Sequence, residues 1–305
     1  IERLTADKKR PAVHTYNATL NSFTKFSGGQ GTEEMLVTDV FTAGKLKEYE
    51  AWLRSRNASW NTVSTYMRVL KAVYNRLVEA KRLTYDARLF DSVYTKVEAQ
   101  SKRSLTEEQM NTLLHTDFEK LPEDVQNVLA YFLLMFLFRG MPFIDMAYLR
   151  KQDLKEHCIT YCRHKTGKKM VVRIPHEATA LFEKCRNKKT DSGYLFPILD
   201  ETTENEKKLY ENYRQALRTF NRKLAKMAAL LLPGTNISSY TARHTWATLA
   251  FYSGIPIGII SKALGHSSIK VTETYLKPFE NEKVDAANDE LIMSVVKRSK
   301  EKIVA

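Results

Sequence analysis

The clearest alternation of apolar and polar positions in this chain lies in residues 59–83. Apolar residues recur there at three- and four-residue steps, the spacing that places them on one face of an α-helix. Ser59 precedes the pattern and has a side chain suited to a helix N-cap. Arg68, Lys71 and Asn75 fall on the opposite side. That polar stripe is either a solvated helix face or a surface for phosphate groups, and the pattern does not separate the two.

Other stretches show the same kinds of pattern. The run VLAYFLLMFLF at 128–138 is apolar throughout but too short to cross a bilayer as a helix, so we expect a helix buried in a core. Thr106 and Gln109 have the spacing of a capping box, which predicts a helix starting at about 106. Two short strand-like segments flank a turn at Gly167 and predict a β-hairpin. Further helices are expected at 17–26, 40–56 and 209–231, and the hairpin strands at 158–163 and 170–175.

These elements predict a mainly α-helical chain with a small β-sheet, divided into two domains. With 305 residues the chain can form two separate cores. The polar segment 99–105 is interpreted as a linker between a helical domain at 1–98 and an α+β domain at 106–279. A charged tail follows at 280–305, with an apolar patch at 291–296.

Three short helices are predicted near the end of the second domain. Serines stand before the first, which carries Arg243, and before the third, which carries Tyr275, as candidate N-caps. Pro256 suits the first turn of the middle helix, and Gly265 suits its end.

The net charge of the chain indicates what kind of partner it binds. The chain has 48 Lys and Arg against 35 Asp and Glu, a net charge of +13, and its pI is about 9.5. A basic chain of this size favours a polyanionic partner, although spare surface lysines give the same balance.

The cysteines argue against a disulfide framework and against a metal site. Cys158, Cys162 and Cys185 are odd in number, and no signal peptide is evident, which fits a reducing cytoplasm. His157 and His164 flank the first two cysteines, but the spacing matches no usual zinc finger. An alternating strand explains the segment more simply, so we expect no metal.

Two segments carry the most distinctive chemistry, YTARHTWATLA at 240–250 and LGHSSIKVTETYL at 264–276. Through short helices they place Arg243, His266 and Tyr275 near one another. Phosphoryl transfer needs an in-line nucleophile and donors around the phosphate oxygens. The set is therefore suited to making and breaking a phosphodiester bond without metal.

In their order and spacing these segments resemble the tyrosine recombinases, the phage-integrase family of site-specific DNA recombinases. The resemblance extends over about residues 17–278. The residues of the two motifs are similar to those of recombinases of the Bacteroides group in particular. It implies a helical core-binding domain followed by a catalytic domain, and DNA cleavage through a 3′-phosphotyrosine without metal, ATP or cofactor. The implied partners are double-stranded DNA with specific recombination sites and a homo-tetramer on that DNA. The resemblance leaves room for accessory DNA-bending proteins and implies a cytoplasmic, nucleoid-associated location, with the tail contacting a neighbouring protomer.

The resemblance also implies roles for single residues. Tyr275 matches the nucleophile, and Arg243 matches the second catalytic arginine, which binds non-bridging phosphate oxygens. His266 matches the histidine that binds the phosphate or takes part in proton movement to and from the tyrosine. Lys165 matches the hairpin lysine that protonates the departing 5′-oxygen, and Asp145 matches an acidic position that buttresses the arginines.

The chain departs from the family pattern at two places. Tyr240 occupies the position of a histidine, where its hydroxyl can still donate to a phosphate oxygen. Pro142 falls where the first catalytic arginine belongs. We expect Arg139, one helical turn earlier, to replace it if the helix extends through that residue. Lys168 and Lys169 lie in the same turn as Lys165 and are alternatives to it as the acid, and Lys168 is also expected to contact DNA.

Two other functions remain open at this point. A type IB topoisomerase-like enzyme would relax any supercoiled DNA by the same chemistry. A recombinase that has lost its catalytic activity would bind DNA without cutting it. The two departures from the family pattern keep this non-catalytic alternative open. Trapping on a suicide substrate separates a binder from an enzyme.

Overall fold

The computed structural model describes residues 1–7, 9–28, 36–97, 104–200, 205–276, 284–285 and 288–293. Within them the chain is mainly helical with one three-stranded sheet, as the sequence predicts. It separates into two compact units, Ile1–Ser101 and Lys102–Ala305, and each has a core of its own. Most of the predicted linker and most of the predicted tail lie outside the described residues.

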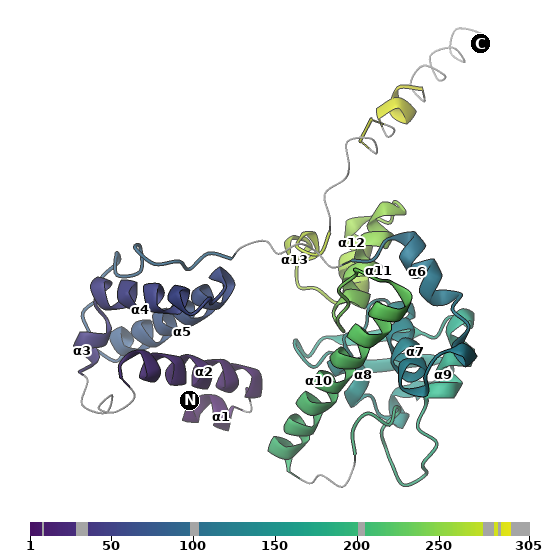
Figure 1. Ribbon diagram of the computed structural model, residues 1–305, viewed down its shortest axis with the longest axis horizontal. Coiled ribbons are helices and arrows are strands. Elements are labelled where there is room, and N and C mark those ends of the chain that lie inside the picture. Colours follow the sequence, from purple (N-terminus) through teal and green to yellow (C-terminus); the bar gives the residue numbers. More distant parts are fainter. Residues whose placement is uncertain are drawn as a thin grey trace. The chain divides into compact units, whose positions relative to one another are not determined.

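The first unit is a bundle of helices, drawn in purple and blue in Figure 1: α1 (Glu2–Ala6), α2 (Arg10–Phe26), α3 (Val37–Val40), α4 (Ala43–Ser55) and α5 (Trp60–Glu79). Its core lies between α2, α4 and α5, where Leu46, Tyr49 and Val63 are fully buried. Ser59 caps α5 by accepting a hydrogen bond from the Thr62 backbone N–H at 3.2 Å. The amphipathic helix and its cap are therefore confirmed.

The second unit is arranged around α7 (Glu123–Leu137), the buried helix that the sequence predicts. Its Val125, Leu129 and Phe132 are fully buried. The helices α9 (Thr179–Cys185), α10 (Glu206–Leu231) and α11 (Thr241–Tyr252) pack against it. Because neighbours cover it on several sides, α7 is apolar along most of its length. The other elements are α6 (Glu107–Leu114), α8 (Phe143–Tyr148), α12 (Ile257–Leu264), α13 (Ile269–Glu273) and the 3₁₀ turns η1 (Phe118–Lys120), η2 (Lys151–Asp153) and η3 (His176–Ala178).

The described helices include none that combines the length and the apolar character needed to cross a membrane.

The sheet of the second unit is antiparallel, with strands in the order β1 (Leu154–Lys155), β2 (Cys158–Cys162) and β3 (Lys169–Arg173). Strands β2 and β3 form the predicted hairpin. Ile159 lies opposite Val172, and Tyr161 lies opposite Met170. These side chains are buried while their neighbours along the strands are more exposed, so the sheet has one face on the core.

The helix ends near the site agree with the sequence at two places and differ at a third. Thr106 and Gln109 form the predicted capping box of α6, and Gly265 ends α12 in the left-handed conformation. The predicted serine cap of α11 is wrong, because Tyr240 occupies the N-cap position and its side chain makes no capping hydrogen bond. The backbone N–H groups of the two serines are already bound by other side chains.

Candidate active site

Arg243 lies near the start of α11 with 2% of its surface exposed. Its Nη1 donates to the Gly140 carbonyl oxygen at 2.9 Å, and its Nη2 donates to the Leu264 carbonyl oxygen and to His266 Nε2. Its Nε is buried without a hydrogen-bond partner among the described residues. A buried cation with an unused donor can stabilise an anion that brings its own acceptors.

The backbone at Gly140 approaches Arg243 so closely that only glycine fits. Gly140 has a φ of +66°, and a Cβ atom there would lie 2.9 Å from the Arg243 Cα. That clash would be with backbone, which cannot move aside as a flexible side chain can. The carbonyl that orients the guanidinium therefore depends on the glycine that follows the end of α7.

His266 follows α12 and is 8% exposed, with its imidazole between two partners. Its Nε2 lies 3.1 Å from Arg243 Nη2, and its Nδ1 lies 2.9 Å from Thr272 Oγ1. Because a guanidinium only donates, Nε2 accepts, and the proton lies on Nδ1. Burial, followed by the charges of nearby arginines and lysines, lowers the pKa of His266 to about 4. The imidazole is therefore neutral at pH 7.

Tyr275 lies in the turn just after α13, rather than within the helix that was expected to carry it. Its half-buried ring lies 4.8 Å from the ring of His244 and 4.8 Å from that of His266. The guanidinium carbon of Arg243 is 5.7 Å from the ring centroid. The Tyr275 hydroxyl oxygen is 2.6 Å from that of Tyr240. The chain thus brings together all four of these predicted site residues, and His244 packs beside them.

Arg163 is a member of this group that the sequence interpretation missed. It follows β2 and is 6% exposed. Its Nη1 donates to the Leu264 carbonyl oxygen at 2.9 Å, and its Nε lies 3.4 Å from Asp145 Oδ2. The signal available was its place two residues before Lys165 in a chain that lacks the family's first arginine. Its place at the end of a strand concealed it.

The end of α12 holds the two guanidinium groups near each other, because the Leu264 carbonyl oxygen accepts from both arginines. The last carbonyls of a helix lack partners and carry partial negative charge, which offsets the repulsion between the two cations. Burial and the charge of Arg163 nevertheless lower the pKa of Arg243. Gly265 has a φ of +67°, and a Cβ atom there would lie 2.9 Å from the Arg163 Cδ, so any other residue would be strained and would displace the Arg163 side chain.

Asp145 of α8 is 3% exposed and contacts the end of β2 and the turn of the hairpin. Its Oδ1 accepts from the His164 backbone N–H at 2.8 Å, and its Oδ2 pairs with Arg163. The carboxylate therefore fixes both the backbone of the hairpin and one arginine.

Arg139 lies just after the end of α7 and not within the helix. The prediction depended on a helix through residue 139, but α7 ends at Leu137 and Arg139 has a φ of +59°. Its Nη1 donates to the Val171 carbonyl oxygen of β3 at 3.4 Å. The condition for Arg139 to replace the missing arginine is therefore not met. The left-handed turn, which brings Gly140 against Arg243, redirects the Arg139 side chain.

Two predicted lysines flank the site on the hairpin turn. Lys165 is exposed at the turn, where its ammonium group is free to move. Lys168 Nζ donates to the His266 carbonyl oxygen at 3.1 Å. Both positive charges contribute to the lowered pKa of His266, so both lie near the imidazole.

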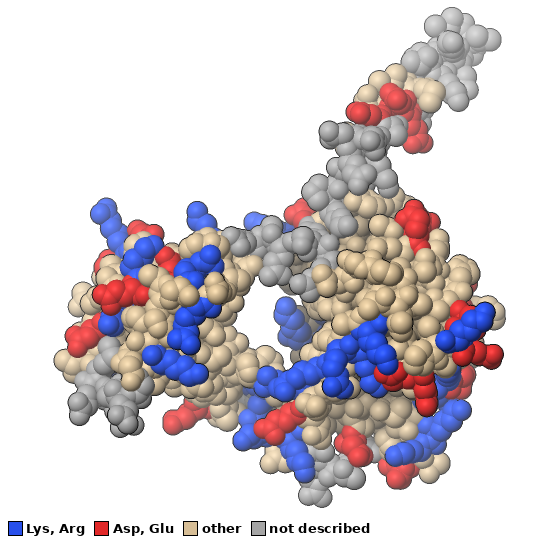
Figure 2. Space-filling view, viewed as in Figure 1, with Lys and Arg blue, Asp and Glu red and all other residues tan. Residues whose placement is uncertain are grey.

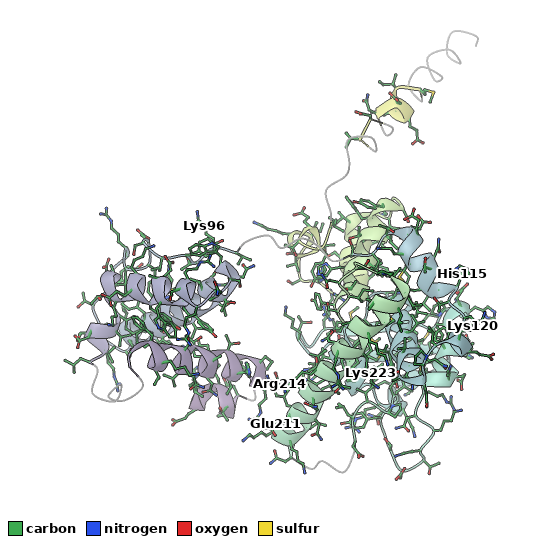
Figure 3. The ribbon with its side chains drawn as sticks, in the orientation of Figure 1. Lys96, His115, Lys120, Glu211, Arg214 and Lys223 are labelled. Atoms are coloured by element: carbon green, nitrogen blue, oxygen red, sulfur yellow. The ribbon has the colours of Figure 1, made fainter. Side chains whose placement is uncertain are left out.

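The predicted DNA-contacting residues of the first unit, Arg68, Lys71 and Asn75, are all exposed on α5. In the second unit Figure 2 shows a band of Lys and Arg side chains across α10, and Figure 3 labels Arg214 and Lys223 on this helix. The sequence interpretation did not single out this band, because the apolar face of α10 dominates its pattern. Each unit thus presents positive side chains to solvent.

Two family profiles match the chain. The Phage integrase family matches residues 103–282, and the Phage integrase SAM-like domain matches residues 1–88. Tyrosine recombinase XerA of Pyrococcus furiosus is 26% identical over 243 residues, which cover 77% of this chain and 76% of that protein. Tyrosine recombinase XerC of Rickettsia bellii is 24% identical over 281 residues, which cover 88% of each.

Solved structures share the fold at lower identity. The Tn1549 transposon integrase in complex with a circular intermediate DNA has a TM-score of 0.63 at 17% identity, covering 95% of this chain and 98% of that one. A lambda integrase dimer bound to a COC′ core site has a TM-score of 0.63 at 14% identity, covering 90% and 74%. At these identities the likeness establishes the fold. The Phage integrase match spans more than half of the chain, and the chain therefore belongs to the phage integrase family of tyrosine recombinases.

Proposed function

We propose that this recombinase cleaves and rejoins duplex DNA at specific sites through a 3′-phosphotyrosine on Tyr275, with neither metal nor ATP. The observation that carries the proposal is the half-buried Tyr275 side chain beside the buried guanidinium of Arg243 and the imidazole of His266. A phosphate can reach such a hydroxyl, and the neighbouring donors stabilise the charge of the transition state.

The balance of buried charge supports an anion as the ligand. Arg243 and Arg163 are both buried, and one buried carboxylate, Asp145, accompanies them. Two cations and one anion leave a net charge of +1 in a region shielded from water. Such an excess is unfavourable unless a counter-charge enters. A phosphodiester carries one negative charge and several acceptor oxygens, which is the complement of this site.

The proposed reaction balances within the groups of this chain. The Tyr275 oxygen attacks phosphorus, so that an O–P bond forms while the bond from phosphorus to the 5′-oxygen breaks. His266 Nε2 accepts the Tyr275 proton once Arg243 has turned its donor to the phosphate, whose negative charge raises the low pKa of the imidazole. Lys165 gives a proton to the departing 5′-oxygen. Attack by another 5′-hydroxyl reverses these steps.

Arg163, rather than Arg139, is proposed as the second guanidinium on the phosphate. Its partners place it at the end of α12 beside Arg243, within the charge excess described above. Its planar group offers donors to a second phosphate oxygen, as the family's first arginine would. Asp145 would then act by fixing Arg163 in place.

The proposed domains follow the two units. Residues 1–98 form the core-binding domain, 99–105 the linker and 106–279 the catalytic domain. The tail at 280–305 contacts a neighbouring protomer in a homo-tetramer on DNA. A lambda integrase tetramer has been solved bound to a Holliday junction. Accessory DNA-bending proteins and a cytoplasmic, nucleoid-associated location belong to the same proposal.

The proposed DNA contacts lie on the exposed positive surfaces. In the first unit they are Arg68, Lys71 and Asn75, and in the second they are Lys168 and the basic side chains of α10. Contacts to phosphates fix the position of the protein on the duplex without reading its sequence.

A suicide substrate tests the proposed chemistry. A nicked duplex that loses its 5′-hydroxyl fragment after cleavage traps the covalent adduct, which is measured on a denaturing gel. We expect the native chain to form the adduct and Tyr275→Phe to form none. A native chain that binds DNA but forms no adduct on any candidate site would be the non-catalytic alternative instead. Relaxation of supercoiled plasmids regardless of sequence would identify the topoisomerase-like alternative.

A further inference from the structure

The hydroxyl groups of Tyr240 and Tyr275 lie 2.6 Å apart, although the two residues are separated by 35 positions in the chain. Tyr240 occupies the N-cap position of α11, and its ring lies 5.3 Å from that of His244. His244 in turn stacks on Tyr275. The Tyr240 hydroxyl therefore contacts the hydroxyl of the proposed nucleophile, whereas the family resemblance predicts that it donates to a phosphate oxygen.

We propose, on the basis of the function proposed above, that Tyr240 is a positioning residue that donates a hydrogen bond to the Tyr275 oxygen. The donated bond leaves the Tyr275 hydroxyl proton free to leave and keeps a donor on the oxygen as its negative charge grows. Hydrogen bonds from O–H to a charged oxygen are short, at about 2.5–2.7 Å, and are roughly twice as strong as neutral ones. Tyr240 takes no proton and gives none away in this role.

The surroundings support this direction of donation. Although 41% of Tyr240 is exposed, desolvation on its packed side and then the bond to Tyr275 raise its pKa to about 12, so the hydroxyl keeps its proton near pH 7. The groups facing the pair are His244 and Arg243 on α11, His266 after α12 and, at longer range, Arg163 from the hairpin. The two histidine rings pack against the Tyr275 ring, so the oxygen end of that side chain meets the Tyr240 hydroxyl and the Arg243 guanidinium.

The rate of covalent adduct formation against pH tests the proposal. In Tyr240→Phe we expect a rate about tenfold to hundredfold lower near pH 7, the loss expected for one hydrogen bond to a charged group. The deficit should narrow as the pH rises, because alkaline conditions themselves favour removal of the phenol proton. Tyr252→Phe, the same chemical change at the other end of α11, is the matched control and should leave the profile unchanged. The proposal is overturned if the rate in Tyr240→Phe equals the native rate or is lower by the same factor at every pH. An equal loss at every pH is what a loss of packing alone would produce.

A measurement on the free protein tests the contact without cleavage. With ¹³C at the Cζ of all tyrosines, the NMR signal of Tyr275 is assigned from its absence in Tyr275→Phe. We expect this signal to shift in Tyr240→Phe and to stay in place in Tyr252→Phe. No shift in Tyr240→Phe means that the hydroxyl groups are not bonded, and the proposal fails. If the native chain forms no adduct while the signal does shift, the proposed function fails and the contact stands.

Discussion

Buried charge is handled in opposite ways in the two units. In the first unit Glu50 is 4% exposed, and its oxygens accept from the Tyr94 backbone N–H at 2.6 Å and from the Lys47 ammonium group. One anion thus meets one cation. In the second unit Arg243 and Arg163 are both buried, and among the described residues one buried carboxylate, Asp145, accompanies them and pairs with Arg163. The paired charge of Glu50 fixes the segment around Tyr94 to α4. The excess positive charge of Arg163 and Arg243 instead favours the binding of an anion.

The two kinds of buried charge should affect folding stability and DNA cleavage differently. Removing a balanced charge should lower the free energy of unfolding and leave cleavage unchanged. Removing an unbalanced one should abolish cleavage, with a stability effect that depends on the partner left behind.

The largest effect is expected at Arg163. In Arg163→Ala, single-turnover cleavage of a suicide substrate should fall by about a thousandfold or more, because a guanidinium on the transferring phosphate is lost. DNA affinity, measured by gel shift, should stay nearly unchanged. Arg139→Ala is the matched control and should keep near-native cleavage. The reverse result would return the role to Arg139.

A double variant separates loss of cleavage from loss of folding in Arg163→Ala. Arg163→Ala alone leaves Asp145 buried without its partner, which can cost about 3–5 kcal/mol. Arg163→Ala combined with Asp145→Asn removes the stranded charge while keeping an oxygen for the His164 backbone N–H. This double variant should melt closer to the native temperature and still fail to cleave.

Gly265→Ala should disturb the site by displacing Arg163. The new methyl group would meet the Arg163 Cδ and the Met170 side chain, in a backbone conformation that disfavours alanine by about 1–2 kcal/mol. Cleavage should fall about tenfold to a hundredfold. Gly254→Ala shares the positive φ, but nothing lies within 4 Å of its added Cβ atom. It should lose similar stability and keep its activity, and equal activity in both variants would refute the steric argument.

Glu50→Gln tests the balanced side of the comparison. The loss of a charged hydrogen-bond acceptor in the first unit should reduce stability by about 2 kcal/mol, measured by chemical unfolding. Cleavage at saturating DNA should stay at the native rate. Glu48→Gln, whose side chain is 63% exposed in its pair with Lys45, should change stability by less than about 0.5 kcal/mol. A loss of cleavage in folded Glu50→Gln would show that the two units are not separable in this way.

The smallest effect is expected at Lys71 on the exposed face of α5. Lys71→Ala should weaken DNA binding modestly and reduce the slope of log affinity against log salt by about one, because one phosphate contact is lost. Lys120→Ala removes another exposed lysine, one that pairs with Asp117, and it should leave the slope unchanged. Identical slopes for both variants would mean that α5 is merely solvated.

The sequence by itself determined the elements and the identity of the main chemical groups. The periodic face of α5, the apolar α7 and the β2–β3 hairpin depend on local spacing, which is written along the chain. Arg243, His266 and Tyr275 could be singled out because their motifs are local as well. Their short helices leave little freedom in how they meet.

Tertiary structure alone decided which arginine accompanies Arg243 and what Tyr240 contacts. Arg163 reaches the Leu264 carbonyl across 101 positions, and Tyr240 reaches Tyr275 across 35. The left-handed turn at Arg139 depends on the fit of Gly140 against Arg243. Such contacts follow from how helix ends pack in space, and the energy of that packing is set by distant neighbours rather than by adjacent residues.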